Sequence, residues 1–145
     1  MYKHILITTD GSELAARGLD HGFQLAKSLG AEVSVVNVIV PLTGLAFEAV
    51  VESTAIDLYD RQTKEEAEKL EADTKKKAAD IGLPINFVRV NYQFPAEAII
   101  ETAAKRGCDL IVMSSHGRRG LSRMILGSQT AEVLAESKLP VLVVR

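Results

Sequence analysis

The sequence predicts an α/β fold in which helices cover a parallel β-sheet. Short apolar runs rich in β-branched residues alternate along the chain with longer segments whose apolar residues recur at helical spacing. The run 109–114 is almost wholly apolar, which is typical of a central strand covered on both faces. Gly30, Gly82 and Gly107 each end a predicted helix a few residues before a strand. A chain of 145 residues has the size of one domain, to which we assign residues 1–145.

The first strand and the first helix follow from the opening residues. An Ile-Leu-Ile run predicts a strand over residues 4–9, after which Ser12 is placed to cap a helix. Apolar residues recur near helical spacing as far as Leu29, and Gly30 then supplies the left-handed stop. The β-branched run 32–40 predicts the second strand.

The middle of the chain predicts two helices around a third strand. Residues 42–54 show no clear period, so we expect a loop or the start of a helix there. A charged amphipathic helix is predicted over 55–81, and the third strand over 85–90. Pro95 stands at a suitable first helical position for the next helix, which Gly107 stops.

The last third of the chain begins with the apolar strand over residues 109–114. A glycine-rich connection, 115–127, follows it. Ser128 is then predicted to cap a helix that reaches about Lys138, and a final strand is predicted over residues 141–145.

Composition and charge exclude several classes of protein. The chain is 47% apolar and 25% charged, and its formal net charge is −2, which is ordinary for a globular protein and unlike disorder or collagen. This balance also argues against a dedicated nucleic-acid binder. The single cysteine, Cys108, cannot form an internal disulfide, and we interpret it as a small apolar filler. We see neither a signal peptide nor an apolar run long enough for a membrane, so a cytoplasmic location is expected.

Polar residues that follow three of the strands mark where a ligand is expected. In an open parallel sheet, ligands bind beyond the carboxyl ends of the strands, where the strand order changes direction. The first strand delivers Thr8, Thr9 and Asp10 to that edge, the second delivers Val38 and Ile39, and the fourth delivers Met113 and Ser114. If the first strand lies between the second and the fourth, these segments surround one crevice.

The segment from Ser114 to Thr130 has the composition of a polyphosphate cradle. Gly117 and Gly127 allow an anion to approach the backbone closely, and the helix after Gly127 offers unsatisfied N–H donors at its positive end. Ser128 and Thr130 add hydroxyl donors. An alternative stays open at this point, in which the glycines only shape a loop and Ser128 is only a cap.

Two common nucleotide motifs are absent. No Gly-x-x-x-x-Gly-Lys-Ser/Thr sequence occurs, and no Gly-x-Gly-x-x-Gly follows the first strand. A standard P-loop hydrolase and an ordinary dinucleotide dehydrogenase are therefore disfavoured.

The chain resembles the universal stress protein family over its whole length. The resemblance rests on five segments, whose order and spacing together make it specific. They are Thr8-Thr9-Asp10-Gly11-Ser12, Val36-Asn37-Val38-Ile39, Ser114-Ser115-His116-Gly117-Arg118-Arg119-Gly120, Leu126-Gly127-Ser128 and Pro140-Val141-Leu142-Val143-Val144. The resemblance implies a doubly wound five-stranded parallel sheet of order 3-2-1-4-5 with helices on both faces. It also implies a homodimer formed through the C-terminal strand.

The resemblance further implies an ATP site at the crevice. The ATP-binding branch carries Gly-x-x-Gly-x9-Gly-Ser/Thr, whereas this chain has Ser114 in place of the first glycine, followed by Gly117, Gly127 and Ser128. Carried over by position, Asp10 faces the adenine or its neighbourhood, and Thr8 and Thr9 line the same wall. Val38 contacts adenine, and Met113 and Ser114 lie near the adenosine. The triphosphate falls to Gly117, Gly127, Ser128, Thr130 and the backbone amide of Gln129. Mg²⁺ is expected on the phosphates, without a protein cage of its own.

The function expected from this resemblance is that of a nucleotide-responsive regulator of the stress response. The alternatives are a slow ATP hydrolase or nucleotidyl transferase, or a protein that binds cyclic AMP or a protein partner. His116 has no nucleophile or orienting carboxylate linked to it by sequence, so we interpret it as ordering the loop or lying beside a phosphate. Asp10 has the alternative of a simple Asx turn. No Asp or Glu occurs from Leu110 to Ala131, where Arg118, Arg119 and Arg123 make the segment positive.

Overall fold

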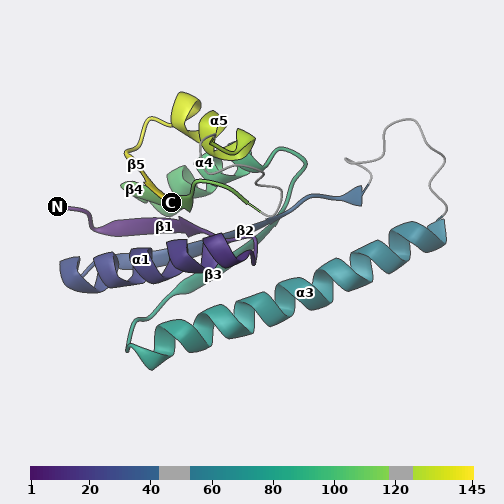
Figure 1. The fold of residues 1–145 in the computed structure, drawn as a ribbon, viewed down its shortest axis with the longest axis horizontal. Helices are drawn as coiled ribbons and strands as arrows, with labels where there is room; N and C mark the ends of the chain where they lie inside the picture. The colour runs from purple at the N-terminus through teal and green to yellow at the C-terminus, as the bar shows by residue number, and fades with distance from the viewer. Residues whose placement is uncertain (43–52, 118–125) are drawn as a thin grey trace.

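The structure is a computed structural model that describes residues 1–42, 53–117 and 126–145. A single five-stranded sheet forms its centre, flanked by helices on both sides (Figure 1). The strands are β1 (His4–Thr8), β2 (Glu32–Ile39), β3 (Asn86–Asn91), β4 (Leu110–Ser114) and β5 (Val141–Val144). The helices described are α1 (Glu13–Leu29), α3 (Ser53–Asp80), α4 (Pro95–Arg106) and α5 (Ser128–Glu136).

The sheet has the order β3-β2-β1-β4-β5, and all four pairings are parallel. The expected fold class and strand order are therefore confirmed. β1 lies between β2 and β4: the chain first forms β2 and β3 on one side of β1 and then crosses over to form β4 and β5 on the other. The carboxyl ends of β1, β2 and β4 consequently meet at one edge, where the ligand crevice was expected.

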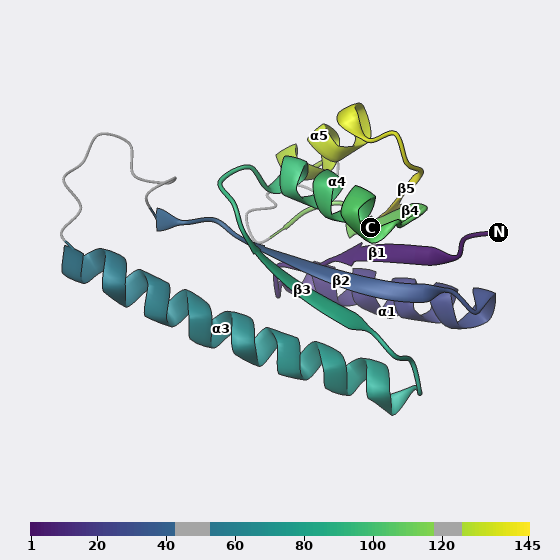
Figure 2. The same cartoon turned by 180° about the vertical axis from the view of Figure 1, so that it is seen from behind.

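The helices form two layers, because successive side chains of each strand face opposite sides of the sheet. Ile5 and Ile7 pack in one core with Phe23 of α1, whereas Leu6 packs in the other with Ile99 of α4 and Val133 of α5. Figures 1 and 2 show α1 and α3 on one side of the sheet and α4 and α5 on the other. Cys108 is buried in the second core, as the sequence suggested, and burial raises the pKa of its thiol to about 11.

The ends of α1 agree with the residues that predicted them. The Ser12 side chain accepts a hydrogen bond from the Ala15 N–H at 3.1 Å, and Gly30 adopts a left-handed conformation with φ of 65°. The helix therefore begins and ends at the expected residues.

The start of α5 differs from the prediction by one residue. Gly127 is the N-cap of α5, and Ser128 is its first helical residue. In the described part of the chain, no side chain caps this end of the helix. The Gly127 N–H donates to the Ser115 carbonyl at 2.8 Å, and its own carbonyl accepts from the Ala131 N–H at 2.9 Å. Gly127 thus joins the loop to the first helical turn, and the predicted cap at Ser128 was wrong.

Most other boundaries shift by one or two residues. α3 begins at Ser53 and ends at Asp80, whereas the predicted helix was 55–81. α5 ends at Glu136, two residues before the predicted Lys138. Most of the aperiodic segment 42–54 and of the connection 115–127, including its arginines, lies outside the described residues.

Candidate functional site

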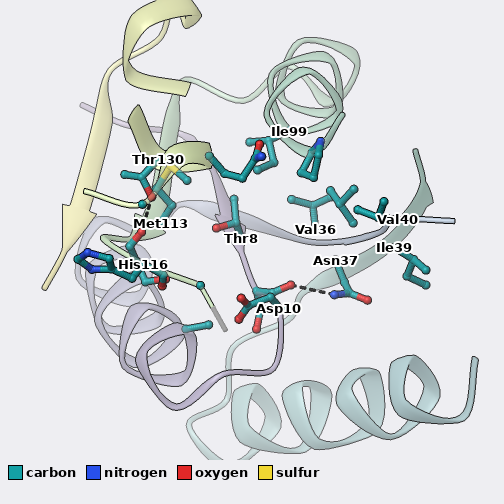
Figure 3. Close-up of a pocket in the computed structure, with 18 of the residues that line it drawn as sticks. Thr8, Asp10, Val36, Asn37, Ile39, Val40, Ile99, Met113, His116 and Thr130 are labelled. Carbon is teal, nitrogen blue, oxygen red and sulfur yellow. Dashed lines mark hydrogen bonds between the residues drawn. The ribbon is translucent and has the colours of Figure 1, made fainter. Parts of the chain in front are cut away.

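A cavity of about 770 Å³ opens at the carboxyl edge of the sheet, where β1, β2 and β4 end (Figure 3). It lies at the expected crevice, and every residue that the sequence predicted for the site lines it. These residues are Thr8, Thr9, Asp10, Val38, Met113, Ser114, His116, Gly117, Gly127, Ser128, Gln129 and Thr130. Its volume is typical of a small-molecule site.

The end of β1 holds Asp10 in a defined turn. The Asp10 Oδ1 oxygen accepts from the Ser12 N–H at 2.9 Å, which is the Asx turn that the sequence left open. The Thr9 carbonyl accepts from the side-chain Nδ2 of Asn37 at 2.9 Å, so β1 is tied to β2 directly before Asp10. Asp10 therefore forms the turn and also lines the cavity.

Gly117 lies against this carboxylate. A Cβ atom at Gly117 would stand 2.5 Å from the Asp10 Oδ2 oxygen, closer than two non-bonded atoms can approach. Glycine is thus the residue that lets the loop after β4 meet the loop after β1, and the two loops together form one side of the cavity.

The hydroxyl groups of Ser114, at the end of β4, and Thr130 donate hydrogen bonds to backbone carbonyls. The Ser114 hydroxyl donates to the His116 carbonyl at 2.8 Å, and the Thr130 hydroxyl donates to the Ser114 carbonyl at 2.9 Å. In this conformation the one proton of the Thr130 hydroxyl is used within the protein, so the expected donation from this hydroxyl to a ligand stays a prediction. The bond fixes α5 to the end of β4 (Figure 3).

Backbone N–H groups remain the donors at the start of α5. The first residues of a helix have no acceptor within it, and the aligned peptide dipoles make this end positive. The Ser128 and Gln129 side chains are exposed there, and the Gln129 Oε1 oxygen accepts from the Ala96 N–H at 3.0 Å. Gln129 thus satisfies the start of α4 with its side chain, and it also lines the cavity in the first turn of α5.

His116 pairs with its neighbour Ser115. Its Nδ1 nitrogen lies 3.0 Å from the hydroxyl of Ser115, which is only 3% exposed. A buried hydroxyl cannot reach a substrate, so the pair orders the loop. Among the described residues, no group of three or more His, Cys, Asp or Glu side chains is arranged to hold a metal ion.

One wall of the cavity includes residues of α3 that were not predicted, namely Tyr59, Thr63, Glu66, Ala67 and Leu70. Asn37 and Ile39 of β2 line the same wall, and Ile39 was expected at this edge of the sheet. The alternation along β2 places Asn37 and Ile39 on the face opposite Val38, which is a pattern readable from the sequence. That α3 runs beside the end of β2 depends on packing in three dimensions, and no motif indicated it.

The comparison with known families decides the relationship. The model of the universal stress protein family matches residues 1–145, which is the whole chain. The chain belongs to the universal stress protein family.

Named relatives support this assignment over full length. Universal stress protein YxiE of Bacillus subtilis is 35% identical and is covered completely, as is this chain. Universal stress protein MJ0531 of Methanocaldococcus jannaschii is 36% identical, with all of this chain and 83% of the relative covered. The solved structure of MJ0577 from the same organism superposes with a TM-score of 0.82 at 33% identity, covering 99% of this chain and 96% of that one. The universal stress protein fold is therefore shown by sequence and by structure.

Within the described ranges, no helix of this family member is both long and apolar enough to cross a membrane.

Proposed function

We propose that this universal stress protein binds an adenine nucleotide, ATP, in the cavity at the carboxyl edge of the sheet and acts as a nucleotide-responsive regulator. One observation carries the proposal. The cavity joins the N-terminus of α5, with its backbone N–H donors and positive end, to the carboxylate of Asp10. A triphosphate suits the N–H donors at the start of α5, and ribose hydroxyls suit the Asp10 carboxylate. One nucleotide can therefore match both parts of the cavity.

Two solved proteins of the same fold contain a bound adenine nucleotide, which supports the proposal. A universal stress protein was solved in complex with cAMP, and it superposes on this chain with a TM-score of 0.72 at 23% identity. The Archaeoglobus fulgidus universal stress protein was solved in complex with dAMP, with a TM-score of 0.68 at 19% identity. At these identities the likeness concerns the fold, and it makes adenine nucleotides the first ligands to test.

The proposal also covers the cation, the cellular location, the oligomeric state and the protein partner. Mg²⁺ travels with the triphosphate, because it prefers phosphate oxygens and water to a protein cage. The protein acts in the cytoplasm as a homodimer paired through β5. The nucleotide changes the population of conformations at the loops around the cavity, which a regulatory protein partner can recognise.

The direct test is a calorimetric titration of the protein with ATP and Mg²⁺, together with two variants. Ser128→Asp places a carboxylate in the first turn of α5, where it stabilises the helix but repels a triphosphate. We expect this variant to keep or raise the melting temperature and to lose ATP affinity by about tenfold or more. Gln62→Glu adds the same charge at an exposed residue of α3 outside the cavity lining and is the matched control, with unchanged affinity.

Two results would contradict the proposal. One is the absence of binding by the unmodified protein at millimolar ATP. The other is equal ATP affinity for Ser128→Asp and Gln62→Glu, because a triphosphate at α5 must respond to a charge placed there.

A further inference from the structure

The cavity has two sides, divided by the end of β2. Val36 and Val38 pack with the core under α4 and α5, whereas Asn37 and Ile39 face the side of α3. Figure 3 shows the Asn37 and Ile39 side chains on one side of the strand and Val36 on the other. The family resemblance places adenine against Val38 of β2, the strand that divides the two sides, whereas no expected contact involves the α3 side.

Three polar side chains of α3 line this second side, and we call them the α3 wall: Tyr59, Thr63 and Glu66. The wall has a fixed place relative to β2, because the Tyr59 hydroxyl donates to the Val40 carbonyl at 2.9 Å. Its residues recur at three- and four-residue spacing, so they share one face of the helix. The same face therefore meets any ligand that fills this end of the cavity.

The hydrogen-bond polarity of the α3 wall is one-sided. A hydroxyl has one proton, and Tyr59 gives its proton to Val40. Thr63 likewise gives its proton to the Tyr59 carbonyl within the helix. Both hydroxyl oxygens can then only accept, and the oxygens of the Glu66 carboxylate are also acceptors. The wall consequently favours a ligand group that brings its own N–H or O–H donors.

The opposite end of the cavity has the reverse polarity. The start of α5 presents backbone N–H donors and a positive dipole end, and it suits the anionic part of a ligand. A nucleotide with its triphosphate at α5 and its ribose near Asp10 extends its base toward the rest of the cavity. The base then meets acceptors rather than donors.

We propose that the α3 wall determines base specificity by accepting a hydrogen bond from the exocyclic amino group of adenine. This inference rests on the proposed nucleotide binding and adds the residues that select the base. A purine with a carbonyl oxygen at the same position, as in hypoxanthine, places an acceptor against acceptors and a carboxylate. Such a mismatch leaves polar groups unpaired and is disfavoured.

The experiment compares ATP with inosine triphosphate, which carries that carbonyl oxygen, by calorimetric titration of the full chain with Mg²⁺. We expect the unmodified protein to bind ATP about tenfold more tightly than inosine triphosphate. The double variant Thr63→Val/Glu66→Gln removes one acceptor and the charge while nearly keeping side-chain volume. Its preference should fall to about twofold or less, through weaker ATP binding and unchanged or tighter binding of inosine triphosphate.

Glu65→Gln is the matched control, because it makes the same charge change one residue away, outside the cavity lining. It should keep the full preference. Retained binding of inosine triphosphate by the double variant shows that the site is still folded.

Three outcomes would overturn the inference, and they separate it from the proposed function. Equal affinity of the unmodified protein for both nucleotides removes base selection but leaves nucleotide binding intact. A preference that survives in Thr63→Val/Glu66→Gln assigns base selection to other groups. If neither nucleotide binds to the unmodified protein, the proposed function fails and the inference fails with it.

Discussion

At the scale of single residues, Gly117 is required by a carboxylate of the protein itself. The sequence suggested that this glycine gives a phosphate room to approach, but the nearest group to its missing side chain is the Asp10 Oδ2 oxygen. Gly117 is not among the glycines with positive φ, so its backbone accepts alanine without strain. Contact with Asp10 is therefore the reason for glycine that the structure provides.

A Gly117→Ala variant tests this contact. Its methyl group would stand 2.5 Å from Asp10 Oδ2, so the carboxylate must move by about an ångström, a displacement of the size that weakens an oriented site strongly. We expect ATP affinity to fall by about tenfold or more, with little change in melting temperature because Gly117 is exposed. Titration calorimetry and a thermal melt measure the two quantities. Affinity equal to that of the unmodified protein would contradict the argument.

The sequence identified which residues gather at the site better than it identified what their atoms do. All the predicted residues line the cavity, because the carboxyl ends of neighbouring parallel strands must meet. The direction of a hydroxyl proton depends on the nearest carbonyl in the folded chain. The Thr130 bond to the Ser114 carbonyl was for that reason beyond prediction. Thr63 of the α3 wall was missed similarly, because in sequence it belongs to an ordinary charged helix.

At the scale of elements, α1 packs on the sheet with two buried glycines, Gly18 and Gly22, which differ in how closely they meet it. A Cβ atom at Gly22 would lie 2.5 Å from Cδ1 and 3.0 Å from Cγ1 of Ile7, whose side chain is fully buried in β1. At Gly18 the nearest atom is the Ser114 nitrogen at 3.6 Å, an ordinary contact. The same helix thus offers one glycine that packing requires and one that it does not.

Alanine substitutions at the two positions should change stability in opposite directions. Alanine gains roughly 1 kcal/mol over glycine in a helix interior, so Gly18→Ala should stabilise the protein by up to about 1 kcal/mol. In Gly22→Ala, overpacking against Ile7 costs about 1–3 kcal/mol, and we expect a net loss of about 1 kcal/mol. Urea unfolding curves of both variants measure the difference. Equal stability of the two would show that Ile7 changes rotamer at no cost.

Element positions were largely predictable, whereas the order of the strands was not. Local chemistry places Ser12 and Gly30 at the ends of α1, and both were confirmed. The pattern of alternating strands and helices indicates a parallel sheet but allows several orders, and the order 3-2-1-4-5 came from the family resemblance. The start of α5 was misplaced by one residue, because serine is also common just inside a helix and the backbone bonds of Gly127 decide the boundary.

At the scale of the whole molecule, β5 leaves one edge of the sheet to be covered. The Pro140 and Val144 carbonyls accept from N–H groups of Ile111 and Ser115 at 3.0 and 2.8 Å. Bonding groups alternate along a strand, so the even-numbered residues of β5 face β4 while the N–H and C=O groups of Val141 and Val143 face outward. In the part of the chain that the structure describes, no strand pairs with this edge, and an apolar edge strand is a template for pairing, which favours the proposed homodimer.

Val143→Pro tests that dimer without breaking the sheet of one subunit. Proline removes the outward N–H of Val143 and places its ring at the outer edge, but the bonds of Leu142 and Val144 to β4 are kept, and proline is tolerated on an edge strand. We expect the unmodified protein to sediment as a dimer and Val143→Pro as a folded monomer, with circular dichroism nearly unchanged. Val143→Ala reduces side-chain volume at the same position but keeps the N–H, so it should remain dimeric. A dimeric Val143→Pro protein would show that subunits associate through a surface other than β5, and a monomeric unmodified protein would contradict the dimer itself.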